Sequence, residues 1–135
     1  MATGGIFLCP GAPSLKTIFV LDDDQEQADL LARALACSQW KVRAFSDPIR
    51  ALAALNSEGA DLLVADLSMP WIDGADVIAS ARLRRPELKV VMISGFSRGA
   101  EIARRHNVAF FPKPVDLDKL RSYAEQALAD SHPAL

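Results

Sequence analysis

The fold is decided by the stretch Thr17-Ile18-Phe19-Val20-Leu21, which is followed at once by Asp22-Asp23-Asp24. A continuous apolar run of this length is typical of a strand that is buried on both faces, as in the centre of a parallel sheet. The next segment, Gln25–Ser38, is expected to be a helix whose apolar residues recur at helical spacing. Those residues are Leu30, Leu31, Ala34 and Leu35. Together the two segments form a unit of strand then helix.

Four further units of the same kind follow along the chain. The expected strands are Lys41–Phe45, Asp61–Ala65, Leu88–Ile93 and Val108–Phe111. The expected helices run from Ser46-Asp47-Pro48 to Leu55, from Asp73-Gly74 to near Arg84, from Ser97 to His106, and from Asp116 to Asp130. Asp47 and Asp116 suit helix N-caps, and a proline prevents continuation beyond the helix that ends near Arg84. This alternation predicts an α/β fold, with helices on both faces of a parallel sheet.

The composition favours one domain without a strong charge bias. The 135 residues are 50% hydrophobic, which is ample for a single core, and 15 Lys and Arg against 17 Asp and Glu give a net charge of -2. We expect residues 17–130 to form the domain, residues 1–16 a flexible extension and residues 131–135 a tail. The charge disfavours direct binding to nucleic acid or to an anionic membrane surface. The two cysteines, Cys9 and Cys37, have no metal-ligand spacing, and a cytoplasmic location is expected.

Polar residues stand where the expected strands end. Asp22-Asp23-Asp24 follows the first strand, Asp66 the third, Ser94-Gly95 the fourth, and Lys113-Pro114 the fifth. Open parallel sheets bind ligands beside the carboxyl ends of their strands, so these groups should converge. Carboxylates brought together raise one another's pKa unless a cation lies between them. An oxygen-rich set without Cys or His favours magnesium over zinc.

Four motifs together resemble the response-regulator receiver family of two-component signal transduction, over roughly Thr17 to Asp130. They are Val20-Leu21-Asp22-Asp23-Asp24, Asp66-Leu67-Ser68-Met69-Pro70 with Asp73-Gly74, Ile93-Ser94-Gly95, and Phe111-Pro112-Lys113-Pro114. The resemblance implies a flavodoxin-like, doubly wound (βα)5 fold whose five parallel strands are ordered 2-1-3-4-5.

The resemblance also assigns a role to each residue of the site. Asp66 would be the phosphoacceptor, and Mg2+ (or Mn2+) would be held by Asp22, Asp23, Asp66 and the backbone carbonyl of Ser68. Lys113 would contact a phosphoryl oxygen, with a cis peptide before Pro114. Ser94 would donate its hydroxyl to the phosphoryl group. Phe110 would be the switch aromatic that couples this chemistry to the surface of the fourth helix, fifth strand and fifth helix.

The implied function is a phosphorylation switch and not a turnover enzyme. The phosphodonor would be a sensor histidine kinase or a histidine phosphotransfer protein, and a downstream protein target would read the phosphorylated form. A homodimer through the fourth helix, fifth strand and fifth helix stays open. Pro112 and Trp71 depart from the usual family pattern and would affect partner choice or phosphoryl lifetime.

Two other functions compete with the switch. One is a receiver-like interaction module that has lost phosphotransfer. The other is an aspartate-nucleophile phosphohydrolase, for which Leu21-Asp22-Asp23-Asp24 would supply the nucleophile, Asp22. That interpretation leaves the motif at Asp66 unexplained, and it leaves little chain for a substrate cap.

Overall fold

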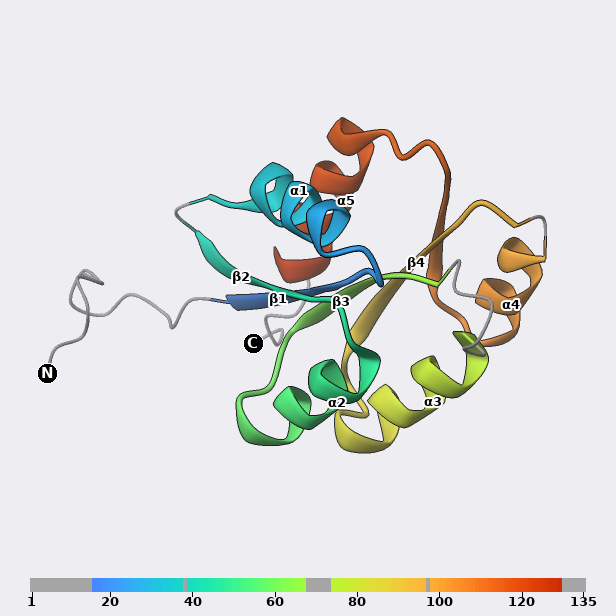
Figure 1. Cartoon of the computed structure of the whole chain (residues 1–135), viewed down its shortest axis with the longest axis horizontal. Helices are drawn as coiled ribbons and strands as arrows, with labels where there is room; N and C mark the ends of the chain where they lie inside the picture. The colour runs from blue at the N-terminus through green and yellow to red at the C-terminus, as the bar shows by residue number, and fades with distance from the viewer. Residues whose placement is uncertain (1–15, 38, 68–73, 97, 130–135) are drawn as a thin grey trace, which may run out of the picture.

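Five strands and five helices alternate along the chain in the computed structural model, which describes residues 16–37, 39–67, 74–96 and 98–129. The strands are β1 (Lys16–Leu21), β2 (Trp40–Phe45), β3 (Leu62–Asp66), β4 (Lys89–Ser94) and β5 (Ala109–Pro112). The helices are α1 (Gln25–Leu35), α2 (Pro48–Ser57), α3 (Gly74–Arg84), α4 (Gly99–Arg105) and α5 (Leu117–Ala129). The strands form one parallel sheet in the order β2-β1-β3-β4-β5, which confirms the predicted fold class and strand order (Figure 1).

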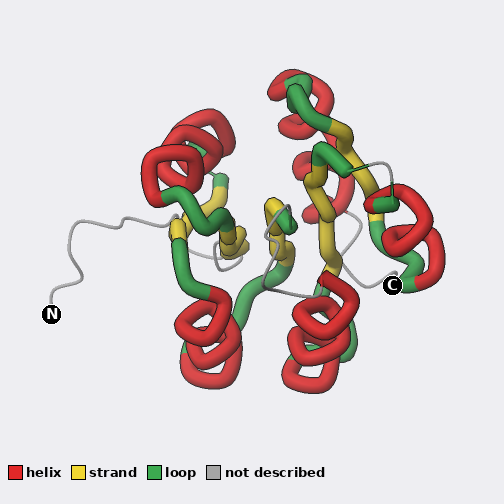
Figure 2. Tube along the Cα trace, turned by 45° about the vertical axis from the view of Figure 1, so that its right-hand side comes forward, coloured by secondary structure: helices red, strands yellow, loops and turns green. Residues whose placement is uncertain are grey.

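Two apolar layers lie on the two faces of the sheet. On one face, Ile18, Val20 and Val64 pack with residues of α1 and α5 such as Leu31 and Leu120. On the other face, side chains of β1, β3 and β4 pack against α2, α3 and the buried Ala103 of α4. The helices accordingly stand on both sides of the sheet (Figures 1 and 2). Because β1, β3 and β4 are covered on both faces, they are continuous apolar runs with no polar alternation.

The sheet order creates a crevice between β1 and β3. From β1 the chain goes to β2 on one side and then to β3 on the other, so the connections after these two central strands diverge. Ligands of open α/β sheets bind at this switch point, outside the carboxyl ends of the strands. Asp22 follows β1 and Asp66 ends β3, so both acids stand at this crevice.

The end of α1 differs from the sequence prediction. The prediction extended this helix to Ser38, whereas it ends at Leu35 and Ala36 has an extended backbone. Groups from elsewhere in the chain bind its last carbonyls, because Trp40 Nε1 donates to Leu35 O at 2.5 Å and Arg121 donates to Ala34 O at 3.0 Å. The expected helix starts at Asp73 and Ser97 lie outside the described residues. The other boundaries agree to within about two residues, the usual uncertainty of helix ends.

The four apolar residues at helical spacing in α1 are not all buried. Leu31 and Leu35 are buried, Ala34 is partly buried, and Leu30 is 54% exposed. The buried residues Ala28, Leu31 and Leu35 follow the period of a helix, and Leu30 lies off that stripe. Leu30 is therefore a surface residue, and it borders the site described below.

The N-cap of α2 allows a test of the local structure. Asp47 is extended, and its side chain accepts a hydrogen bond from Ile49 N at 2.9 Å, as the Asp-Pro sequence predicts. We expect Asp47→Ala to lower the free energy of unfolding by about 1 kcal/mol, because it removes this cap. Urea denaturation monitored by circular dichroism measures the change. Asp47→Asn keeps the acceptor and serves as the control, and an equal loss in both variants would contradict the capping role.

Candidate functional site

Two buried carboxylates form the centre of the site. Asp22 is 3% exposed and Asp66 is 4% exposed, in spite of their charge. Asp22 is held by its own turn, since its Oδ1 accepts a hydrogen bond from Asp24 N at 2.9 Å. Asp24 in turn caps α1 by accepting from Glu26 N. The three acids thus have different positions: Asp22 is buried, Asp24 caps the helix, and Asp23 is exposed at the rim.

Lys113 brings the positive charge to this pair. Its Nζ lies 2.5 Å from Asp66 Oδ2, and its side chain is 43% exposed. The backbone holds Lys113 in place, because Lys113 N donates a hydrogen bond to Ser94 O. The peptide bond to Pro114 is cis, as expected. A lysine 47 positions away in the sequence therefore reaches Asp66 from the neighbouring edge of the sheet.

Ser94 ends β4 beside Asp66 and is 2% exposed. Its Oγ accepts a hydrogen bond from Phe96 N at 3.0 Å, so a lone pair of the hydroxyl is engaged by the loop toward α4. A hydroxyl can still donate its proton to another acceptor. Ser94 is therefore placed between the acid pair and α4.

Phe110 lies on the α4 side of Ser94. It is half-buried, and it packs against the core on the face of α2, α3 and α4. A Cβ added at Gly99, the first residue of α4, would lie 2.8 Å from Ser94 Cβ and 2.9 Å from Phe110 Cε1. Real Cβ atoms do not approach so closely, so the absence of a side chain at Gly99 lets α4 contact both residues. Ser94, Phe110 and the start of α4 are thus in direct contact.

The charge balance of the acid pair is unfavourable. Burial raises the pKa of Asp22 from its usual 3.8 to about 7, the neighbouring Asp66 carboxylate adds to this, and the hydrogen bond from Asp24 N opposes it. Burial and the Asp66 carboxylate both disfavour the ionised form of Asp22. At neutral pH a bound cation would stabilise the ionised carboxylates of a site of this kind.

This raised pKa predicts how stability depends on pH. Between pH 4 and pH 7 the folded state keeps a proton on Asp22 that the unfolded state has released, so raising the pH through this window lowers stability. For one proton the slope approaches about 1.4 kcal/mol per pH unit. We expect Asp22→Asn to lack this contribution when unfolding free energies are compared at pH 5 and pH 7 in metal-free buffer. Equal pH dependence in both proteins would contradict the assignment.

An open groove of about 850 Å³ leads from the acids toward α1. It is lined by Lys113, by the acids Asp22, Asp23, Asp24 and Asp66, by Gln27 and by apolar residues. Two of these, Leu30 and Leu117, are 54% and 47% exposed. This apolar rim was not predicted from the sequence, in which Leu30 was grouped with Leu31, Ala34 and Leu35 as apolar residues at helical spacing. The helical period of Ala28, Leu31 and Leu35 is the signal that could have excluded it.

A family comparison decides what this arrangement is. Residues 18–125 match the family described as the response regulator receiver domain. The chain belongs to the response-regulator receiver family. The match covers all five strands apart from the first two residues of β1, and it includes Asp22, Asp66, Ser94 and Lys113.

Individual relatives agree with this assignment. The receiver chain is 32% identical over 115 residues to the DNA-binding transcriptional regulator NtrC of Salmonella typhimurium, which is 83% of this chain and 24% of the relative. The crystal structure of NtrX from Brucella abortus with ATP is 33% identical, with a TM-score of 0.76 over 87% of this chain and 28% of that one. A CheY-like receiver from Methanospirillum hungatei JF-1, 24% identical with a TM-score of 0.78 over 87% and 96% of the two chains, has the same fold. The chain spans about a quarter of the length of the curated relatives it matches.

The receiver site contains hard oxygen donors without a closed metal cage. Among the described residues, no group of three or more His, Cys, Asp or Glu side chains is placed to hold a metal ion. Magnesium usually binds proteins through only one or two carboxylates and keeps several waters, so Asp22 and Asp66, with Asp23 at the rim, could hold it. Ser68, the expected carbonyl ligand, and Trp71 lie outside the described residues.

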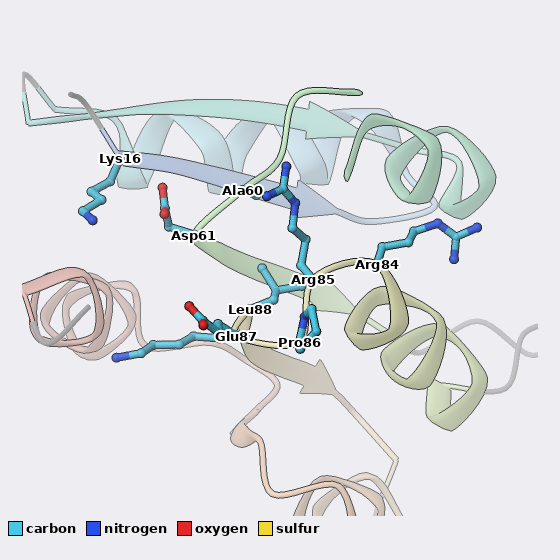
Figure 3. A pocket seen from close by; sticks show the side chains of 9 residues that line it. Lys16, Ala60, Asp61, Arg84, Arg85, Pro86, Glu87 and Leu88 are labelled. Atoms are coloured by element: carbon cyan, nitrogen blue, oxygen red, sulfur yellow. The ribbon is translucent and has the colours of Figure 1, made fainter. Parts of the chain in front are cut away.

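A second pocket of the receiver domain, about 450 Å³, lies at the opposite, amino end of the sheet. Its two arginines diverge: Arg85 points toward Ala60 and donates to Leu55 O, whereas Arg84 points elsewhere and donates to Ser80 O (Figure 3). These arginines bind carbonyls at helix ends and do not converge on a common point.

None of the helices in the described part of the chain has the length and apolar character needed to span a membrane.

Proposed function

We propose that Asp66 accepts a phosphoryl group from a phosphohistidine of a sensor histidine kinase or of a histidine phosphotransfer protein. The observation that carries this assignment is the 2.5 Å contact between Lys113 Nζ and Asp66 Oδ2 at the carboxyl edge of the sheet. An Asp66 oxygen attacks phosphorus, the bond between phosphorus and the histidine nitrogen breaks, and the imidazole leaves. The Lys113 ammonium group then exchanges its contact with the Asp66 carboxylate for a contact with a phosphoryl oxygen.

Magnesium, or manganese, fits the remaining charges of the site. Asp22 and Asp66 are both buried, and the Asp66 carboxylate disfavours ionisation of Asp22, so a hard divalent cation held by Asp22, Asp23 and Asp66 would relieve the repulsion. When bound, the metal offsets charge on the transferring phosphoryl group. The backbone carbonyl of Ser68 is proposed as a further ligand.

The switch from chemistry to surface would run through Ser94 and Phe110. The Ser94 hydroxyl would turn toward the new phosphoryl oxygen and give up its contact with Phe96 N. Phe110, which contacts Gly99 as Ser94 does, would move into the space this leaves. The result would be a changed surface at α4, β5 and α5, which a downstream protein target reads.

The groove beside Asp66 supports a protein as the phosphodonor. Its apolar rim, with Leu30 and Leu117, suits contact with a helix that carries the phosphohistidine. A homodimer through α4, β5 and α5 is also proposed, although two arginines of these helices are engaged within the chain. Arg105 pairs with Glu101 at 3.1 Å, and Arg121 binds the end of α1.

Contacts within the site favour Asp66 over Asp22 as the nucleophile, and so favour a receiver over a phosphohydrolase. Lys113 contacts Asp66. In contrast, one oxygen of Asp22 accepts a hydrogen bond from the Asp24 amide, and burial disfavours the ionised form of Asp22. A neutral carboxyl group is a poor nucleophile. We therefore assign Asp22 to the metal, whose positive charge would favour the ionised form of Asp22.

Removal of the metal tests this function. We expect the chain to gain one phosphoryl group from acetyl phosphate in buffer with Mg2+, and the rate to fall by about 100-fold or more in excess EDTA. Intact-mass spectrometry over time measures the gain. Restoring Mg2+ in excess over EDTA should restore the rate, which controls for damage by the chelator. Uptake that is equally fast without divalent metal would contradict the proposed mechanism.

A further inference from the structure

We propose that Arg82, on α3 and outside the site, is a latch that holds α4 in the position seen here and thereby opposes activation. The inference rests on the proposed function, because it concerns how phosphorylation at Asp66 reaches α4. It follows from how α4 is held at each of its two ends.

Packing alone holds α4 weakly. The helix has seven residues, Gly99–Arg105, of which only Gly99 and Ala103 are buried. Helices this short are marginal by themselves, and elements with few buried contacts are the ones that shift or open most readily. Specific contacts at the helix ends therefore contribute a large share of what fixes α4.

At its amino end α4 rests on the switch residues. Gly99 lies against Ser94 and Phe110 so closely that a Cβ there would be 3.0 Å or less from atoms of both. If Ser94 turns toward a phosphoryl group, this support changes. The start of α4 is then free to follow.

At its carboxyl end α4 is bound by Arg82. The guanidinium donates to His106 O at 2.6 Å and to Asn107 O at 3.5 Å. The last carbonyls of a helix lack partners within the helix, and a cation is favourable there. The other end of this contact is anchored in the core, because Val77, Ile78 and Ala81 of α3 are buried.

The geometry makes the contact sensitive to any movement of α4. A displacement of about 1 Å at His106 takes the 2.6 Å hydrogen bond beyond the range of a good one, and the 3.5 Å bond is already at its limit. A shift of α4 that starts at Gly99 and reaches His106 must break the latch. Arg82 thus favours the conformation without a phosphoryl group over the one with it.

The chain offers a matched control on the same helix. Arg84 is exposed and donates to Ser80 O within α3, so it carries the same charge without linking two elements. Arg82→Gln should bind beryllofluoride, in the presence of Mg2+, about ten-fold more tightly than the unmodified chain. Arg84→Gln should stay within about two-fold of the unmodified chain. Isothermal titration calorimetry gives the dissociation constants, and Arg82→Lys, which keeps the charge, should lie between the two.

A merely structural Arg82 would lower the thermal unfolding midpoint without tightening the binding of beryllofluoride. Equal or weaker binding by Arg82→Gln, with Arg82→Lys behaving in the same way, would therefore overturn the latch. A second measurement separates this failure from failure of the proposed function. Without any ligand, amides 102–108 should exchange hydrogen faster in Arg82→Gln than in Arg84→Gln. If no form binds beryllofluoride, the proposed function fails, and unchanged exchange at these amides overturns the latch by itself.

Discussion

Asp66→Asn is expected to abolish the gain of a phosphoryl group from acetyl phosphate. The amide that replaces the carboxylate lacks the nucleophilic charge, although it is close in size and occupies the same buried position at the end of β3. The loss should be complete within detection by intact mass, which exceeds the effect expected for any other single substitution. The fold should survive, because removing one of two buried carboxylates also removes their mutual repulsion.

Asp61, at the other end of β3, provides a matched control. Asp61 precedes β3 at the amino end of the sheet and accepts a hydrogen bond from Thr17 N at 2.8 Å. Asp61→Asn should accept a phosphoryl group at the rate of the unmodified chain. Uptake retained in Asp66→Asn and lost in Asp22→Asn would instead support an aspartate-nucleophile phosphohydrolase.

Among the substitutions, Lys113→Ala should have the second largest effect, a decrease of about 100-fold in the rate of phosphoryl uptake. The ammonium group that lies 2.5 Å from Asp66 is positioned before the reaction, and removing one such group from a site costs roughly this factor. The rate constant is measured by intact mass at several concentrations of acetyl phosphate.

Lys119→Ala is the control for Lys113→Ala, because Lys119 is an exposed lysine on α5. It should leave the rate unchanged. Magnesium should still bind to Lys113→Ala, since the carboxylates remain. A normal rate in Lys113→Ala would contradict the role of the lysine, and a complete loss of metal binding would indicate that the site had collapsed.

The fold was predictable because its signals are local. The apolar run Thr17–Leu21 needs cover on both faces, and the alternation of such runs with helical segments leaves few arrangements other than a parallel α/β sheet. The strand order came from the resemblance. The predicted end of α1 was wrong because Trp40 and Arg121, from other parts of the chain, bind the last carbonyls of the helix. A continuing apolar sequence carries no sign of such long-range partners.

The site was predictable as a set of residues but not as a geometry. Strand ends placed Asp22, Asp66, Ser94 and Lys113 at one edge, and the structure brings them together there. The engagement of Ser94 Oγ by Phe96 N and the contact of Gly99 with Ser94 and Phe110 depend on the loop after β4. A hydroxyl rotamer and an approach of a few ångströms follow from packing, which no spacing in the sequence encodes.

Locating the phosphoryl group tests most directly whether Asp66 is the phosphoacceptor. After reaction with acetyl phosphate and Mg2+, the chain is treated with borohydride, which reduces an aspartyl phosphate to homoserine, and is then mapped by peptide mass spectrometry. We expect homoserine at position 66 alone. Homoserine at position 22, or an unreduced Asp66 in a chain whose intact mass has risen, would contradict it.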